Sequence, residues 1–351
     1  MYPRIIINKE KFRHNLKHLL NICHDRDISV MAVSKVFCAD QELLNIIIEE
    51  NADYIADSRV ENLMGMSSVI PKVMLRLPSI GDAKNIVQHS DISLNSEFST
   101  IKYLDKYANE LDVIHGVILM IDLGDLREGI FDEKEIIETV RKVLKLKNIK
   151  LTGIGTNLTC YGGIIPSNEN LEKLVYFKKL IEKEFEIKLE IISGGNSSNI
   201  ELLLKEKMPK EINNLRLGES IVLGRETAYG NYLDNTYADV FTLEAEIIEI
   251  KEKPSVPIGE VGMNAFGKTP KFVDKGTMLR AILSIGKQDV DHIELIPYDT
   301  VVLIGSSSDH IIVDISNSQD IYEVGDTMLF KLTYSSILSL MTSKYVTKFY
   351  E

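Results

Sequence analysis

Short runs of β-branched and other apolar residues alternate with longer amphipathic stretches over residues 1–230, and this alternation limits the chain to an α/β fold. Most of the runs are apolar almost throughout, as parallel strands buried on both faces should be. The predicted strands are 30–33, 54–56, 72–77, 92–94, 116–121, 151–155, 189–193 and 215–217. Predicted helices between them include 41–51, 97–110, 133–146 and 170–184.

Eight such βα units in roughly 200 residues predict a (β/α)8 TIM barrel. A doubly wound parallel sheet is the alternative, because hydrophobic periodicity alone does not separate the two folds. A further strand over 2–7 precedes a helix over 9–20, and this strand could pair with either part of the chain.

The pattern changes near Tyr237, after which strand-like runs dominate. These runs are 240–250, 277–284, 300–304, 311–315 and 328–332, and prolines and glycines separate them. We therefore expect two domains, a barrel over 1–236 and a C-terminal, mostly antiparallel β domain over 237–351.

The charge balance excludes some function classes. There are 40 Lys and Arg against 52 Asp and Glu, a formal net charge of −12, which argues against a nucleic-acid partner. Cys23, Cys38 and Cys160 are an odd number of thiols at low density, which indicates a reducing compartment. No apolar run approaches the ~18 residues that span a bilayer, and the N-terminal segment lacks a signal-peptide core. We expect a cytoplasmic protein that binds a small molecule and no membrane.

A lysine stands at the end of the first predicted barrel strand. Lys35 follows Ser34 in the segment MAVSKVFCAD. In a (β/α)8 barrel the strand C-termini and the following loops build the active site. A lysine buried there is costly unless it is used or paired, so Lys35 is a candidate catalytic residue. The alternative is an edge lysine whose amine reaches solvent.

Two loops at the seventh and eighth strands favour a phosphate group. The first runs from Ser193 through Gly194 and Gly195 into the predicted start of a helix, and the second is the segment LRLGES at 215–220. Glycines followed by polar residues at a helix N-terminus can cradle an anion. Phosphate sites in these barrels frequently lie after strands seven and eight. The alternative is a pair of tight turns.

Lys35, the SGGNSS loop and the LRLGES segment, in this order and followed by a β domain, resemble the alanine-racemase-like (fold type III) pyridoxal-phosphate enzymes. The resemblance covers essentially the whole chain. The segments GEVGMNAFGKTP (259–270), AILSIGKQDVD (281–291) and GSSSDHIIVD (305–314) are more similar to the ornithine racemase branch of this group. The resemblance implies pyridoxal 5'-phosphate (PLP) as cofactor and a homodimer in which each site is completed by the partner's β domain.

The resemblance also implies which residues grip the phosphate of the cofactor. Asn196 and Ser197 match the phosphate loop of the family, and Gly218 and Glu219 would offer backbone N–H groups to the same phosphate. Tyr334, in the segment LTYSSIL, matches a tyrosine near the C-terminus that also reaches it.

Other residues would surround the ring of the cofactor. Lys35 would hold it as a Schiff base and act as one proton-transfer base. Arg216 matches the arginine that faces the pyridine nitrogen, and Arg127, in DLGDLREG, matches one near the ring oxygen and the substrate carboxylate. Asn157 stands where alanine racemase has a ring-stacking histidine, and Ser193 opens the phosphate loop.

The resemblance implies racemisation of an amino acid, most specifically interconversion of L- and D-ornithine. Inversion needs a base on each face of the planar carbanion, and Lys35 would serve one face. At the place of the family's second base, a partner tyrosine, this chain has Phe266, which carries no proton. We look to Asp309 and His310 for that role. A carboxylate there could instead bind a cationic side chain, and a plain turn before strand 311–315 is the further alternative. Asp289 is a second candidate.

Other functions remain open at this stage. A racemase for alanine, lysine or several amino acids, a PLP carrier without catalysis, and a PLP lyase are the rivals. The segment 262–269 formally matches the nucleotide-binding pattern GxxxxGK[ST], but prolines flank it where that site needs a strand and a helix. His14 and His18 have metal-ligand spacing without a third ligand, and we expect no metal site.

Overall fold

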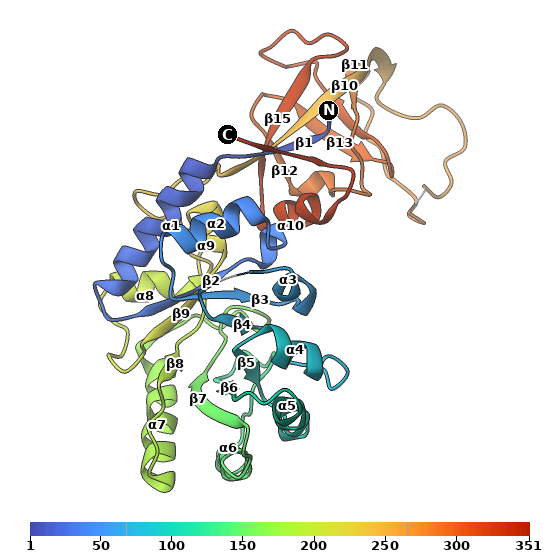
Figure 1. Cartoon of the computed structure of the whole chain (residues 1–351). Coiled ribbons are helices and arrows are strands. Elements are labelled where there is room, and N and C mark those ends of the chain that lie inside the picture. The colour runs from blue at the N-terminus through green and yellow to red at the C-terminus, as the bar shows by residue number, and fades with distance from the viewer. Residues whose placement is uncertain (68, 265) are drawn as a thin grey trace. The chain divides into compact units, whose positions relative to one another are not determined.

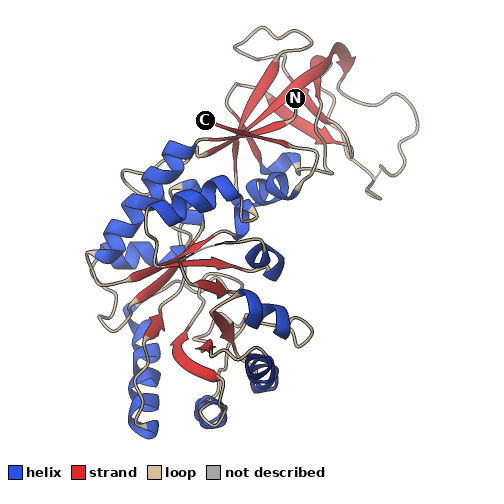
Figure 2. Ribbon diagram, in the orientation of Figure 1, coloured by secondary structure: helices blue, strands red, loops and turns tan. Residues whose placement is uncertain are grey.

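The computed structural model describes residues 1–67, 69–264 and 266–351 (Figure 1). The chain divides into two units, one of Lys11–Ala238 and one of Met1–Glu10 with Asp239–Glu351. Helices lie around the strands of the first unit, and strands dominate the second (Figure 2).

The unit Lys11–Ala238 is built on a closed barrel of parallel strands in the order β2 to β9, with β9 returning to pair with β2. The prediction of a (β/α)8 barrel is therefore confirmed. The doubly wound alternative is wrong, because β2 and β9 would not pair with each other in an open sheet. The barrel strands are β2 (Ser29–Val33), β3 (Tyr54–Asp57), β4 (Lys72–Met74), β5 (Ile92–Asn95), β6 (His115–Met120), β7 (Ile149–Gly155), β8 (Ile191–Ser193) and β9 (Asn214–Leu217).

Helices follow the strands around the barrel (Figure 1). Ser167 caps the longest of them, α7, through a capping box with Asn170. The helices are α1 (Lys9–His24), α2 (Gln41–Glu49), α3 (Val60–Met64), α4 (Ala83–His89), α5 (Phe98–Glu110), α6 (Glu133–Val143), α7 (Asn168–Phe185), α8 (Ile200–Leu204) and α9 (Glu219–Leu223). Short 3-10 turns, η1 (Lys35–Phe37) and η2 (Ser197–Asn199), follow β2 and β8.

Apolar side chains fill the barrel interior, including Met31, Val33, Ile118 and Met120. The closure of β7 on β8 depends on a glycine, because a Cβ at Gly153 would lie 1.9 Å from the carbonyl oxygen of Ile191. The interior is thus a packed core, which leaves the strand ends as the place for chemistry.

The second unit is an antiparallel sheet in the order β12-β15-β10-β11-β14-β13. Strand β1 (Arg4–Ile7) joins it, antiparallel to β10 and parallel to β16. The remaining elements are β10 (Phe241–Pro254), β11 (Thr277–Leu283), η3 (His292–Glu294), β12 (Leu295–Pro297), β13 (Val302–Ser306), β14 (Ile311–Asp314), β15 (Thr327–Leu332), α10 (Tyr334–Thr342) and β16 (Thr347–Tyr350).

The pairing of β1 changes the expected boundaries. Residues 1–10 group with the β unit rather than with the barrel range 1–236, because Ile5 and Ile7 are fully buried and their strand is hydrogen-bonded to β10. At the other boundary the barrel unit ends at Ala238.

The segment that matches a nucleotide-binding pattern lies in the long loop between β10 and β11, and Ala265 within it is outside the described residues. His14 Nε2 lies 2.8 Å from the carbonyl oxygen of Asn235. Among the helices that the structure describes, none is long and apolar enough to cross a membrane.

Candidate active site

The C-terminal ends of β2, β7, β8 and β9 carry most of the residues singled out in the sequence. These strands are neighbours in the barrel, so the loops that follow them share one rim. The residues are Lys35 after β2, Asn157 after β7, Ser193, Asn196 and Ser197 at the end of β8, and Arg216, Gly218 and Glu219 at the end of β9.

Ser197 joins the two glycine-containing loops. Its hydroxyl lies 3.0 Å from the hydroxyl of Ser220 and accepts the N–H of Ser220 at 3.2 Å. The N–H of Gly218 points to the same oxygen at 3.4 Å. Gly218 packs closely on the end of β2, since a Cβ there would lie 3.1 Å from Cβ of Val33. Two backbone N–H groups of the loop after β9 therefore converge on the Ser197 hydroxyl of the loop after β8, in a region that suits an anion.

Gly195 gives this loop its shape. Its φ of +143° is one that other residues rarely adopt, and a Cβ would lie 2.4 Å from Oδ1 of Asn199. The Asn199 amide in turn donates to the carbonyl of Gly194 at 3.2 Å. A side chain at position 195 would displace Asn199 and open the turn.

Arg216 is buried in the barrel rim and donates three hydrogen bonds to neighbouring groups. Its Nη1 donates to the hydroxyl of Ser193, and its Nη2 donates to the carbonyl of Thr156 at 2.6 Å and to Oδ1 of Asn157. Burial lowers the pKa of Arg216 to about 10. The guanidinium still carries its proton at neutral pH and presents a fixed positive charge.

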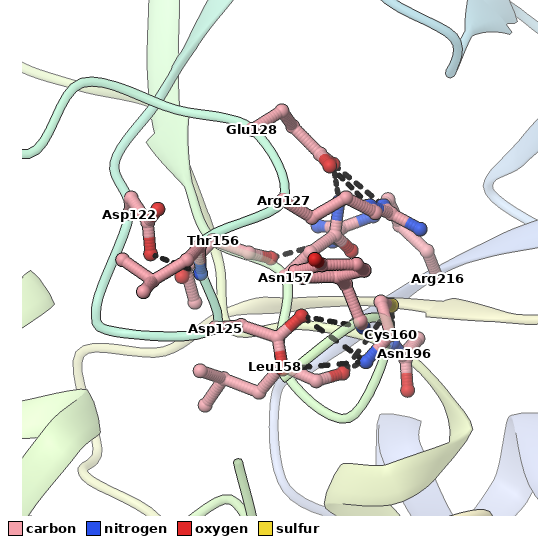
Figure 3. Close-up of polar contacts among 12 residues, drawn as sticks. Asp122, Asp125, Arg127, Glu128, Thr156, Asn157, Leu158, Cys160, Asn196 and Arg216 are labelled. Atoms are coloured by element: carbon pink, nitrogen blue, oxygen red, sulfur yellow. Dashed lines mark hydrogen bonds and ion pairs between the residues drawn. The ribbon is translucent and has the colours of Figure 1, made fainter. Parts of the chain in front are cut away.

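Arg127 and Glu128 belong to the loop after β6, and they lie beside Asn157, which follows β7 (Figure 3). Arg127 makes a forked contact with the Glu128 carboxylate, through Nε and through Nη2, the latter at 2.6 Å. The hydrogen bond to Glu128 raises the pKa of Arg127 above its usual value. The amide of Asn157 donates to the same carboxylate, so this group is shared between two neighbours.

The Asp125 carboxylate organises the loop after β7. It accepts the N–H groups of Tyr161 at 2.9 Å, Cys160 at 3.2 Å and Ile164 at 3.2 Å. Burial raises the pKa of Asp125, but these backbone bonds outweigh it and leave the pKa lowered. Asn196 bridges to this loop, since its amide donates to the carbonyl of Leu158 at 3.0 Å.

Lys35 begins η1 and is half-buried. The residue before it, Ser34, is fully buried and donates its N–H to the carbonyl of Ala56 at 2.9 Å. Two residues after the turn, Cys38 and Ala39, have positive φ values of 53° and 52°. This backbone conformation is uncommon outside glycine, and it ends the turn directly after Phe37.

The carboxylate of Glu219 is engaged within the barrel unit. It accepts from Arg225 Nε at 2.7 Å and lies 2.5 Å from Arg225 Nη2. Glu219 therefore has its backbone N–H to offer at the first turn of α9, where no acceptor exists within the helix.

The remaining candidates lie in the β unit. Asp309 and His310 occupy the exposed hairpin turn between β13 and β14, where both N–H groups point to the Ser307 hydroxyl, at 3.3 and 3.1 Å. Tyr334 is the first residue of α10, after the capping residue Thr333. Asp309 and His310 thus form a turn before β14, as the alternative to a functional role for these two residues predicted.

Three segments of this unit that the sequence singled out come together. The ammonium of Lys287 lies over the ring of Phe266, 4.9 Å from its centre. The N–H groups of Lys287 and Gln288 donate to the carbonyls of Ser307 and Ser308 at 2.9 and 3.0 Å. Asp289 accepts a 2.6 Å hydrogen bond from Ser343. The cluster is continuous with the turn that carries Asp309.

Sequence reasoning missed Glu128, Asp57 and Asp125. A carboxylate at the end of a buried strand, as at Asp57, is costly without partners and could have been found by that criterion. Nothing in the spacing of Glu128 or Asp125 separates them from ordinary loop carboxylates.

Comparison with known proteins places the chain. The family described as "Alanine racemase, N-terminal domain" matches residues 7–226. An ornithine racemase from Acetoanaerobium sticklandii is 45% identical over 350 residues, 99% of each chain. A lysine racemase from Thermotoga maritima is 38% identical over 355 residues, 100% of this chain and 99% of the relative. The solved alanine racemase of Bartonella henselae, with covalently bound pyridoxal phosphate, has a TM-score of 0.75 at 16% identity and covers 99% of each chain. By the family match and by full-length similarity, the chain belongs to the alanine racemase family.

Proposed function

We propose that the protein is a PLP-dependent amino-acid racemase that interconverts L- and D-ornithine. The observation that carries the proposal is the 45% identity, over 99% of both chains, to a protein named ornithine racemase. The barrel rim adds a strand-end lysine, two glycine-containing loops that suit an anion, and a buried arginine.

The residues at the rim fit the parts of this cofactor. The loops joined by Ser197 suit a phosphate, since the N–H groups of Gly218 and Ser220 point to one region and the Glu219 carboxylate between them is held by Arg225. The Lys35 amine suits the aldehyde of the cofactor, and Asn196, Ser197, Gly218 and Glu219 would hold the phosphate. Arg216 directs three N–H groups to Ser193, Thr156 and Asn157, so others of its five remain for the ring nitrogen. Tyr334 would add its hydroxyl at the phosphate.

When bound, PLP withdraws electrons from the substrate and makes its Cα–H acidic. Lys35 Nζ would serve one face of Cα: it would remove the proton from one enantiomer and, in the reverse direction, deliver a proton to that face. Arg216 keeps its own proton, because even its lowered pKa of about 10 is well above neutrality. It would therefore not protonate the ring nitrogen, which limits electron withdrawal and favours return of the proton over side reactions. Arg127 would orient the substrate carboxylate.

The second face of Cα needs another group, and we assign it to the β unit of a partner subunit. Asp309 and His310 are the candidates, since both are titratable and exposed on a hairpin turn. Phe266 cannot transfer a proton, but its contact with Lys287 keeps an ammonium near the same turn. The Asp309 carboxylate also suits the distal ammonium of ornithine.

A lysine racemase is the second candidate, favoured by the 38% identity to such a protein over the whole chain. Lysine has one methylene more than ornithine, which a pocket discriminates by only about 1–3 kcal/mol. Both activities therefore belong in one assay.

The test is exchange of the Cα hydrogen in deuterium oxide, followed by proton NMR with PLP and a panel of L-amino acids, and then by chiral analysis. Fastest exchange of ornithine with accumulation of D-ornithine supports the proposal. Faster exchange of lysine supports the second candidate. PLP binding without exchange of any amino acid would overturn the catalytic assignment in favour of a carrier.

Substitution of Asp309 separates its two roles. Asp309→Asn is expected to weaken use of ornithine more than use of alanine if the carboxylate binds the distal ammonium. Equal losses would argue for proton transfer instead. Asp320→Asn, an exposed residue elsewhere in the β unit, is the control.

We further propose that the active form is a cytoplasmic homodimer. Cys23 and Cys160 are free thiols, as is expected in a reducing compartment. Sedimentation equilibrium of the loaded protein tests the assembly. A monomer with full activity would rule out a site completed by a partner.

A further inference from the structure

Glu128 lies at the centre of a chain of polar contacts between two arginines (Figure 3). Its carboxylate accepts from Nε and Nη2 of Arg127, and the same Oε1 that takes the 2.6 Å bond from Nη2 also accepts the amide N–H of Asn157. Oδ1 of Asn157 in turn accepts from Nη2 of Arg216. One carboxylate is thus bonded directly to Arg127 and, through one amide, to Arg216.

We propose that Glu128 is a positioning residue, which holds Arg127 in place and fixes the Asn157 amide that orients Arg216. The inference rests on the proposed function, in which both arginines face the cofactor and the substrate. Glu128 itself touches neither in this assignment and acts only through its two neighbours.

The chemistry of the contacts requires a carboxylate. Three N–H donors converge on Glu128, and a carboxylate offers about four acceptor positions and no donor. A glutamine would turn its NH2 group toward at least one of these donors. The two-pronged contact with Arg127 is of the strong, charge-assisted kind. The orientation of the Asn157 amide follows, because its nitrogen faces the carboxylate and its oxygen faces Arg216.

Glu128 also balances charge between the two cations. Burial lowers the pKa of Arg216 most, Arg127 lowers it further, and Cys160 and Glu128 oppose the decrease. The side chain of Arg127 is 44% exposed and that of Glu128 only 14%. Without the Glu128 carboxylate, the half-exposed Arg127 side chain could turn into solvent, away from the positive charge of Arg216.

The loop itself does not depend on the Glu128 side chain. Asp122 Oδ1 accepts the N–H groups of Gly124 at 2.8 Å and Leu126 at 3.2 Å. Backbone bonds of 3.1 and 2.9 Å join Asp122 to Ile130 and Ile130 to Met120. These bonds fix the path of the chain on both sides of Glu128. Replacement of its side chain should change the arginines and leave the fold intact.

The experiment compares Glu128→Gln with Glu138→Gln, an exposed glutamate that pairs with Arg141 on α6. We expect Glu128→Gln to lower kcat/KM for ornithine by about 10- to 100-fold, as loss of a group that orients a catalytic residue typically does, and Glu138→Gln to change it less than twofold. In a double-mutant cycle, Glu128→Gln should lower kcat/KM less in an Arg127→Ala background than in the wild type, because only the link through Asn157 is left to lose. Losses that multiply, or a Glu128→Gln variant with wild-type activity, would overturn the inference.

A second measurement is independent of turnover. The visible absorbance of the PLP-loaded protein is titrated with pH in the wild type and in both variants. Removal of a negative charge disfavours protonated groups nearby, so Glu128→Gln should move the midpoint to lower pH while Glu138→Gln leaves it unchanged. An unchanged midpoint in Glu128→Gln contradicts the positioning role even if no amino acid proves to be a substrate.

If Glu128→Gln fails to fold, Asn157→Ala takes its place, because it cuts the link to Arg216 and keeps the pair of Arg127 with Glu128. A loss of about 10-fold in kcat/KM is expected from it. Wild-type activity in Asn157→Ala would show that Arg216 needs no such support. Inactivity of the wild-type protein with every amino acid, by contrast, counts against the proposed function alone.

Discussion

The hydroxyl of Ser34 donates a 2.6 Å hydrogen bond to Oδ2 of Asp57, and this bond ties the residue before Lys35 to the end of the neighbouring strand. Oδ1 of the same carboxylate accepts the N–H of Arg59 at 2.8 Å and the amide of Asn62 at 3.1 Å. Burial raises the pKa of Asp57, which its hydrogen bonds oppose. The place of the catalytic lysine candidate is therefore coupled to a carboxylate on another strand.

Replacement of Asp57 tests that coupling. Asp57→Ala leaves buried donors without an acceptor and should lower the free energy of unfolding by about 2–3 kcal/mol, while Asp57→Asn, whose oxygen still accepts, should cost about 1 kcal/mol. Urea unfolding measures both. Equal losses in the two variants would mean that the carboxylate acts by filling space and not by its bonds.

Lys35→Ala should abolish the visible absorbance of the bound cofactor, because the amine that the proposal assigns to the aldehyde is removed. Absorbance spectroscopy of the purified protein with added PLP makes the comparison. Lys84→Ala, on the exposed side of α4, is the control. Persistence of the band in Lys35→Ala would refute the lysine assignment.

Ser197→Ala should weaken PLP binding about 10-fold, since its hydroxyl accepts from Ser220 and holds the two loops together. Ser198→Ala is a matched control, because the Ser198 hydroxyl bonds to Asn199 and not to α9. Fluorescence titration of the apoprotein gives both dissociation constants. The same affinity in the two variants would separate Ser197 from the phosphate.

Gly195→Ala should destabilise the rim by about 1–3 kcal/mol, as the new Cβ combines an unfavourable φ of +143° with a 2.4 Å approach to Asn199. Gly163→Ala isolates the backbone effect, since φ is +69° there and a Cβ would meet no described atom within 4 Å. We expect the smaller loss at Gly163. Thermal unfolding of both variants decides, and a larger loss at Gly163 would reject the steric argument.

His115 predicts a loss of stability in acid. It is buried and lies 2.8 Å from the Ser93 hydroxyl, and burial lowers its pKa to about 4. The pKa of histidine in the unfolded chain is about 6.5. Between pH 6.5 and 4, His115 is therefore protonated in the unfolded chain and still neutral in the folded protein. The contribution of about 3 kcal/mol is complete above pH 6.5 and is lost as the pH falls to 4.

Urea unfolding midpoints at several pH values measure this dependence. His115→Gln keeps a partner for Ser93 and has no proton to gain, so its midpoint should fall less steeply over the same range. Parallel slopes in the two proteins would assign the acid sensitivity to other groups.

The strands of the barrel were predictable because burial on both faces leaves them almost wholly apolar. Each of the eight expected runs overlaps a strand from β2 to β9, with ends that differ by at most three residues. The short strands β12 and β16 and the helix α10 were missed. Their lengths of 3, 4 and 9 residues give little periodicity to detect. The pairing of β1 depends on residues far along the chain, which no local pattern reveals.

The site residues at the barrel rim were predictable only where a short sequence segment indicates their role by itself. Lys35 at a strand end and the glycines before Asn196 carry their own signals. The link of Arg127 to Arg216 through Glu128 and Asn157 does not, because three loops must meet before the contact exists.

Strand β1 lies between β10 and β16, so the barrel unit Lys11–Ala238 is inserted into the β unit along the chain. During synthesis, β1 leaves the ribosome before the barrel. It stays unpaired until the whole barrel unit and then β10 have been made. The barrel can close on contacts among consecutive strands, while the sheet is finished only when Thr347–Tyr350 has emerged. Arrest of translation shortly before that point would leave a closed barrel with an exposed strand edge, the kind of surface that other chains can pair with.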